Sequence, residues 1–190
     1  MKQVIIKRIS MQNFISIGST PVELHYQNGI NLVTGHNHDS NSRNGIGKSA
    51  VFADALFFVL FGQTLRPIPK SLIPNRYSDE RCKVELEFDV LFGDNCDHYT
   101  LTRMMRPARL HLTKNGVDVS RNINKSTQEI NSIINASPEV FRNCVIMSLN
   151  NTLPFMMQSK VEKRKFIEGI LRLDMFSDML LDARKEISEL

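Results

Sequence analysis

The residues best suited to chemistry in this sequence form the stretch Asn44–Ser49, which reads Asn-Gly-Ile-Gly-Lys-Ser. Glycines let successive backbone N–H groups turn inward around a phosphate, Lys48 can bridge the outer phosphates, and the Ser49 hydroxyl can ligate magnesium. The stretch lies between a strand-like run, Ile30 to Thr34, and a helix-like run, Ala50 to Phe61. Strand, glycine loop and helix N-terminus together predict a site for the phosphates of a nucleotide.

The spacing of this loop is irregular. A strict Walker A motif has its first glycine five positions before its last, and that position is Ser42 here. The nearest earlier glycine is Gly35, which precedes Gly47 by 12 positions (47 − 35). We expect Gly35 to open the loop and the polar residues His38 to Arg43 to bulge out before the loop resumes. A glycine-rich turn that binds no ligand is the alternative.

The elements around the loop follow from apolar patterning. Val4 to Ile9 and Val22 to Tyr26 are strand-like, and Asn28-Gly29 is typical of a tight hairpin turn that leads into Ile30 to Thr34. The helix-like run after the loop is apolar nearly all round, which predicts burial, and Gly62 is placed to end it.

Further along, the strand pattern becomes regular. Cys82 to Phe92 alternates apolar and polar residues and predicts a half-buried strand, from which an antiparallel meander continues. Helix starts are predicted near Ser126, Ser137 and Ser159 from capping and proline signals, and Val145 to Met147 resembles a short buried strand. The meander's other strands are predicted at His98 to Met104, Arg109 to Thr113 and Val117 to Val119.

Composition is that of a soluble globular protein. The chain has 190 residues, 42% hydrophobic and 23% charged, with no apolar run long enough to cross a bilayer. The N-terminus lacks a signal-peptide core, and Cys82, Cys96 and Cys144 lack metal-ligand spacing. We therefore expect a cytosolic protein with reduced thiols and no membrane partner. The net charge of +4 is compatible with nucleic acid but is not diagnostic.

Several runs in this sequence match a known family. They are Met11–Gly18, Asn28–Gly35, Asn44–Ser49 and Leu60–Gly62, followed by Pro154–Met156 and the helical stretch Glu162–Leu190. Together they cover almost the whole chain and resemble the N-terminal lobe of SMC-related ATPases of the SbcC type. These are DNA double-strand-break repair ATPases that pair with a metallophosphoesterase nuclease. The Asn-Phe-x-Ser-x-Gly opening and the short lobe are most similar to bacteriophage recombination endonuclease subunits.

The resemblance implies an α/β fold: a P-loop NTPase, specifically the N-terminal lobe of an ABC-type ATPase head, with an antiparallel β meander. It assigns residues 1–157 to this lobe and residues 158–190 to a terminal helix that begins a coiled coil. It implies ATP and Mg²⁺ as cofactors, with Ser49 on the metal. The matching nucleotide-binding positions are Asn37, Asn44, Gly45, Ile46, Gly47, Lys48, Ser49 and Ala50.

Three departures from the family pattern limit this transfer. The excursion His38 to Arg43 is not part of the usual loop, and Ile15 stands where a basic residue is common. Leu149 aligns with a glutamine that normally contacts magnesium and water, and either Asn150 or Asn151 could replace it.

In such ATPases the signature motif, the Walker B carboxylate and the switch histidine come from a C-terminal lobe, and this sequence shows none of them. We therefore expect a truncated N-terminal segment without catalytic residues, which hydrolyses ATP only within the full-length protein. There, the two heads of a homodimer would enclose ATP, and their closure would regulate the nuclease. The heads would also bind double-stranded DNA. We expect the protein in the cytoplasm, which is that of the host cell if the protein is viral. The candidate contacts to DNA phosphates are Arg103, Arg106, Arg109 and Lys114.

Two other functions stay open at this point. One is a nucleotide-free structural module whose terminal helix mediates assembly, which the loop excursion and Leu149 favour slightly. The other is the ATPase lobe of another ABC-type protein, such as a transporter, which the terminal helix disfavours.

Overall fold

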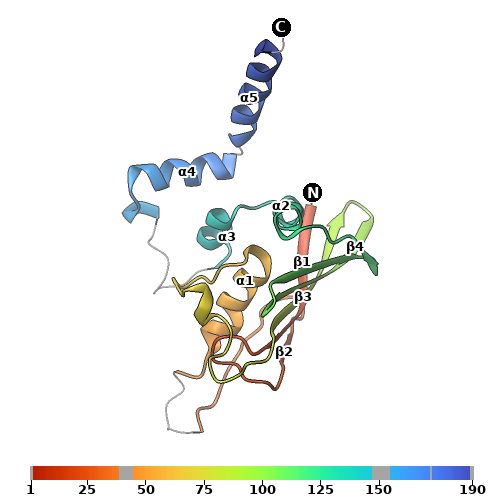
Figure 1. The fold of residues 1–190 in the computed structure, drawn as a ribbon, viewed down its shortest axis with the longest axis vertical. Coiled ribbons are helices and arrows are strands. Elements are labelled where there is room, and N and C mark those ends of the chain that lie inside the picture. Colours follow the sequence, from red (N-terminus) through yellow and green to blue (C-terminus); the bar gives the residue numbers. More distant parts are fainter. Residues whose placement is uncertain (1, 39–44, 147–154, 172, 189–190) are drawn as a thin grey trace. The chain divides into compact units, whose positions relative to one another are not determined.

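The computed structural model describes residues 2–38, 45–146, 155–171 and 173–188 (Figure 1). The chain divides into two compact units, Met1–Ile134 and Asn135–Leu190, which are described separately below. Among the described helices, none combines the length and the apolar character needed to span a membrane.

Among the described residues, the first unit is built on an antiparallel sheet of six strands. The order across the sheet is β2-β1-β3-β4-β5-β6, and each neighbouring pair is antiparallel (Figure 1). The predicted meander is therefore confirmed. The strands are β1 Lys2–Gln12, β2 Val22–His25, β3 Cys82–Phe92, β4 Asn95–Met105, β5 Arg109–Lys114 and β6 Val117–Asp118.

The alternation in β3 decides which face of the sheet is buried. Val84, Leu86 and Phe88 are at most 1% exposed, whereas the polar residues between them are half-buried. In the β3–β4 register Leu86 pairs with Leu101, so the apolar side chains of both strands lie on the same face. This face forms the core of the unit.

In the part of the unit that the structure describes, two helices pack on that face. A helical segment runs from Lys48 through a π-helical stretch, Ala50–Asp54, into α1, Ala55–Phe61, and α2 spans Ile123–Ile134. α1 contacts β3, β4 and α2, and α2 contacts β5. As predicted, α1 is buried nearly all round and ends at Gly62, whose left-handed φ of 73° suits a residue without Cβ.

The second unit consists of short helices. They are α3 Pro138–Cys144, the 3₁₀ turn Phe155–Met157, α4 Lys160–Leu171 and α5 Asp174–Ser188. Ser137 caps α3 by accepting a hydrogen bond from the Val140 N–H, and Ser159 and Glu162 form the predicted capping box at the start of α4. Gly169 of α4 lies against Val140 of α3.

Three expectations about local structure are wrong. Ile30 to Thr34 is not a strand and forms no hairpin after Gly29. Ser126 does not start a helix, because it lies inside α2, while the Asn122 side chain accepts from the Lys125 N–H at the true start. Val145 and Ile146 form no strand, and Met147 lies outside the described residues.

Candidate phosphate-binding site

The site is built from a glycine loop and the helix that follows it. Gly45 and Gly47 both have left-handed backbones, with φ of 79° and 80°, which strain any residue carrying Cβ. Helical structure begins at Lys48, and the Val51 N–H donates to the Gly47 carbonyl at 3.2 Å. The loop therefore delivers Lys48 and Ser49 at a helix N-terminus, as predicted from the sequence.

A cavity of about 560 Å³ lies beside this helix start. Its lining consists of Lys48 and the segment Val33–His36. A volume of this size lies within the range of small-molecule sites. The residues predicted to open and close the loop thus converge on one space.

At two glycines of the site, side chains approach the backbone closely. A Cβ on Gly35 would lie 1.9 Å from Ile46 Cδ1, so the segment that opens the loop packs directly against the loop. A Cβ on Gly47 would lie 3.2 Å from the Ser16 Oγ. Gly35 and Gly47 therefore allow neighbouring segments to support the loop from two sides.

Ser16 belongs to a tight loop after β1 that the structure holds firmly. Asn13 is buried, and its side-chain amide donates to the Glu80 carboxylate and the Arg81 carbonyl, each at 3.2 Å. The Asn75 amide donates to the Ile17 carbonyl at 3.0 Å. Ile15 has a φ of 51°, which is uncommon for a β-branched residue and needs such a surrounding network.

The residues present fit a nucleotide phosphate with magnesium. Lys48 lines the cavity, and the exposed Ser49 side chain makes no capping hydrogen bond to its helix. A hydroxyl in this position can ligate Mg²⁺ while the ammonium and the N-terminal amides face phosphate oxygens. Ala50 is buried beneath, where it contributes packing and its backbone.

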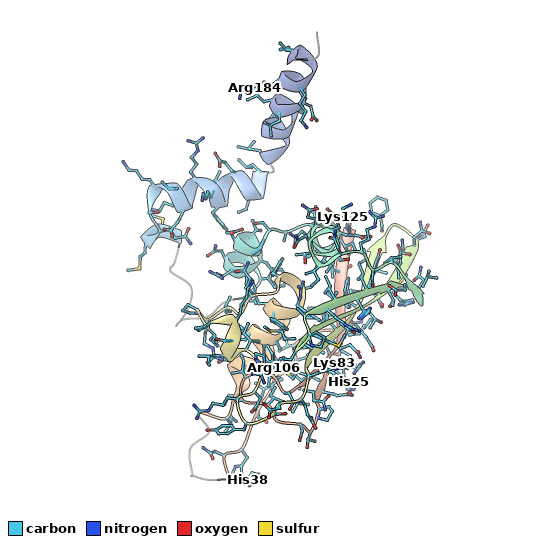
Figure 2. All side chains as sticks on the ribbon, viewed as in Figure 1. His25, His38, Lys83, Arg106, Lys125 and Arg184 are labelled. Carbon is cyan, nitrogen blue, oxygen red and sulfur yellow. The ribbon has the colours of Figure 1, made fainter. Side chains whose placement is uncertain are left out.

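The structure does not reach every predicted position. Asn44 and most of the excursion, residues 39–43, lie outside the described residues, as do Leu149, Asn150 and Asn151. His38, labelled in Figure 2, is the first residue of the excursion and the last one described there, and its ring meets that of His36 edge-on, with ring centroids 5.0 Å apart. Asn37 lies between these two histidines.

The prediction that Arg103 contacts DNA does not fit the structure, because the side chain is buried. It is 7% exposed, and its guanidinium donates to the carbonyls of Val59 at 2.9 Å and Leu60 at 3.1 Å and to the Thr127 hydroxyl at 3.3 Å. Burial lowers the pKa of Arg103 to about 10. The side chain satisfies carbonyls at the end of α1 and joins this helix to α2, which is a structural role.

The other three basic candidates do not form one surface. The Arg106 guanidinium (Figure 2) donates to the Ser78 carbonyl at 3.0 Å. Arg109 is exposed and alternates along β5 with the buried Leu110, whereas Lys114 shares the face of Leu110 and pairs with Asp97 at 2.8 Å. Arg109 and Lys114 therefore lie on opposite faces of the sheet.

Asp54 is a residue whose role sequence reasoning missed. It is 1% exposed, and it accepts from the Arg66 backbone N–H at 3.1 Å and from the Arg66 Nε at 2.7 Å. It therefore fastens the chain that leaves α1 back onto the helix that follows the phosphate loop. The signal available was an acidic residue inside an otherwise apolar helix, followed by a basic residue 12 positions later.

Comparison with known proteins gives the family of this chain and its relatives. The family pattern described as an AAA domain matches residues 8–190. Exonuclease subunit 2 of Escherichia phage RB69 is 28% identical over 193 residues, covering 100% of this chain and 32% of the relative. Exonuclease subunit 2 of Enterobacteria phage T4 is 26% identical over 184 residues, covering 94% of this chain and 30% of the relative. The chain thus spans about a third of the length of these relatives.

Two solved structures share the fold. One, titled "Structural biochemistry of ATP-driven dimerization and DNA stimulated activation of SMC ATPases", has a TM-score of 0.60 at 22% identity and covers 87% of this chain and 99% of its own. The other is an Smc head domain with a coiled coil and joint from Pyrococcus yayanosii, with a TM-score of 0.59 at 20% identity, covering 98% and 36%. They confirm the predicted α/β fold of a P-loop NTPase N-terminal lobe. The chain therefore belongs to the AAA domain family, and it is similar in sequence to phage exonuclease subunits and in fold to SMC ATPase heads.

Proposed function

We propose that this chain is the ATP- and Mg²⁺-binding N-terminal part of a DNA repair or recombination ATPase that regulates an associated nuclease. The observation that carries the proposal is Lys48 at the helix start after two left-handed glycines, lining a cavity of about 560 Å³. Ser49 is the magnesium ligand in this proposal. The phage exonuclease subunits support a nuclease as the partner.

The same proposal requires a second lobe. Ile30 and Leu32, in the segment that leads to the cavity, are 101% and 87% exposed. Apolar side chains so exposed beside a ligand site fit a surface that another part of the full-length protein covers. ATP held between two such heads would favour the closed dimer, because it contacts both heads only in that state. That closure is the proposed route by which ATP controls the nuclease.

Binding of a fluorescent ATP analogue with Mg²⁺ to the full-length protein tests the proposal. Lys48→Ala should abolish saturable binding, and Ser49→Ala should remove its dependence on Mg²⁺. Lys70→Ala is the matched control, because Lys70 is an exposed lysine outside the cavity. Equal binding by the Lys48 and Lys70 variants would refute the site.

ATP hydrolysis should distinguish this chain on its own from the full-length protein. The 190-residue chain alone should release no phosphate from ATP, since a phosphate loop without an opposing wall lacks most of the groups that stabilise the transition state. Steady phosphate release by this chain, lost in Lys48→Ala, would overturn the idea that it needs a second lobe.

DNA binding is proposed for Arg106 and Arg109, whereas Lys114 is left out because it lies on the opposite sheet face from Arg109 and pairs with Asp97. Removing the Arg106 and Arg109 charges together should lower the slope of log binding constant against log salt by about 2, because each phosphate contact contributes roughly 0.9. An unchanged slope would leave both as solvated side chains.

A further inference from the structure

We propose that Asp89, Cys96 and His98 form a binding site for a single Zn²⁺ ion on the sheet face opposite α1 and α2. One carboxylate oxygen, one sulfur and one imidazole nitrogen of these residues lie within 4.8 Å of one another. This is the set of three potential ligands found among the described His, Cys, Asp and Glu residues. It lies in β3 and β4, apart from the phosphate loop.

The strand register brings the three side chains to one face. His98 pairs directly with Asp89, and Cys96 pairs with Leu91, two positions further along each strand. Residues two apart on a strand share a face, so Cys96 and His98 stand side by side with Asp89 across from them. Sequence spacing alone could not reveal this site, because Asp89 is joined to the other two only by the β3–β4 pairing.

The ligand chemistry favours zinc over magnesium or calcium. Thiolate, imidazole and carboxylate are the three ligand types that Zn²⁺ takes, whereas Mg²⁺ and Ca²⁺ prefer oxygen alone. Tetrahedral Zn²⁺ places its ligand atoms about 3.4 to 3.8 Å apart. The observed spacing needs only modest side-chain rotations, which the exposed Cys96 and His98 side chains have room to make. A fourth position stays open to water or a partner's side chain.

Neighbouring groups already orient the ligands. Lys7 Nζ lies 3.3 Å from Asp89 Oδ2, which leaves Oδ1 directed at His98 Nδ1, 2.6 Å away. The His98 backbone N–H donates to the Asn115 side chain at 2.8 Å, and the Asn115 N–H donates to the His98 carbonyl at 2.8 Å. The backbone under the site is therefore fixed on both sides, as a metal site requires.

The simpler account is an ion pair between Asp89 and His98 that involves no metal. The two accounts differ at Cys96, because the ion pair does not need the thiol and a zinc site does. Co²⁺ substitution tests this difference, since a thiolate bound to Co²⁺ gives a charge-transfer absorption band that oxygen and nitrogen ligands do not.

The experiment titrates the reduced protein with Co²⁺, follows the charge-transfer band, and then displaces Co²⁺ with Zn²⁺. We expect one Co²⁺ per chain and a rise in unfolding temperature with Zn²⁺. Both signals should be lost in Cys96→Ser and in His98→Asn. Two matched controls should keep both: Cys144→Ser, at another exposed cysteine, and His111→Asn, at an exposed histidine of β5.

Circular dichroism of each variant checks folding, which these exposed positions should not disturb. Absence of the charge-transfer band in the unmodified protein would overturn the proposal. The band's persistence in Cys96→Ser, or its loss in Cys144→Ser, would equally overturn it, because the thiolate would then come from elsewhere.

Discussion

Replacing Arg103 with alanine should destabilise the first unit strongly. The guanidinium donates hydrogen bonds to two carbonyls at the end of α1 and to the Thr127 hydroxyl of α2. These carbonyls have no partner within the helix, so they depend on this side chain. Truncation would leave them without it and would also remove the link between the two helices that cover the sheet.

The magnitude follows from opposing terms. A pKa of about 10 in place of 12.5 corresponds to about 3 kcal/mol of solvation lost by the buried cation. Hydrogen bonds from a charged donor return about 1.5 to 3 kcal/mol each, so the intact arrangement is only modestly favourable. Arg103→Ala should destabilise the fold by more than the loss of this modest net gain, because the unsatisfied carbonyls cost about 1 to 3 kcal/mol each and the truncated side chain leaves a cavity. We expect a net loss of about 3 to 4 kcal/mol.

Urea unfolding followed by far-ultraviolet circular dichroism measures this loss. With a slope of about 2 kcal/mol per molar urea, the midpoint should fall by about 1.5 M. Arg109→Ala is the matched control, because Arg109 is exposed in the neighbouring strand and should change stability by no more than about 0.5 kcal/mol. Equal midpoints for the two variants would refute the structural role of Arg103 and return it to the set of surface contacts.

Three further perturbations test the same framework. Gly62→Ala should cost about 1 to 2 kcal/mol through its left-handed backbone, and more while Arg103 is present, because the new Cβ would lie 3.0 Å from the Arg103 Nη1; urea unfolding of both backgrounds measures the difference. Asp54→Asn should cost about 2 kcal/mol by weakening the bonds to Arg66, and adding Arg66→Ala should cost little more in the same assay, since both remove one interaction. Burial raises the pKa of Glu85, but hydrogen bonds from Lys83 and Arg8 outweigh it and hold the pKa below 4.5. The resulting stabilisation is present above about pH 4.5 and is lost as the pH falls through the folded-state pKa, so Glu85→Gln should flatten the acid limb of a stability profile, and an unchanged limb would contradict this.

Most of the sheet could be predicted because its signals are local. The alternation in Cys82–Phe92 predicts both ends of β3 correctly, because one buried and one open face impose a period of two. Gly62 and Ser137 were placed correctly because a left-handed cap and a proline start each depend on a few neighbouring residues. Ser126 failed for a related reason, because Asn122 offers an equivalent cap one turn earlier.

The roles of charged residues could not be predicted in the same way. Three arginines, Arg103, Arg106 and Arg109, are close in sequence, but strand alternation and the turn between β4 and β5 place them in different environments. Arg103 is buried and donates to a carbonyl at the end of α1, Arg106 donates to a loop carbonyl, and Arg109 lies on an exposed face. Charge clustering along a chain therefore indicates a surface only where the backbone keeps the side chains on one face. Asp54 likewise acquired a role only through the return of the chain at Arg66.

The segment Ile30–Thr34 shows where strand patterning stops being sufficient. Its apolar and β-branched residues suit a strand, but β propensity measures the fit of side chains to neighbours rather than a preference of the backbone alone. Ile30 and Leu32 are almost fully exposed, so this segment lacks the packing from which a strand gains its stability. Burying one such side chain is worth about 1.5 to 3 kcal/mol. Docking of the proposed second lobe would therefore gain several kcal/mol by covering these two residues. Because the segment leads into the cavity that Lys48 lines, the same docking event would also complete the proposed nucleotide site.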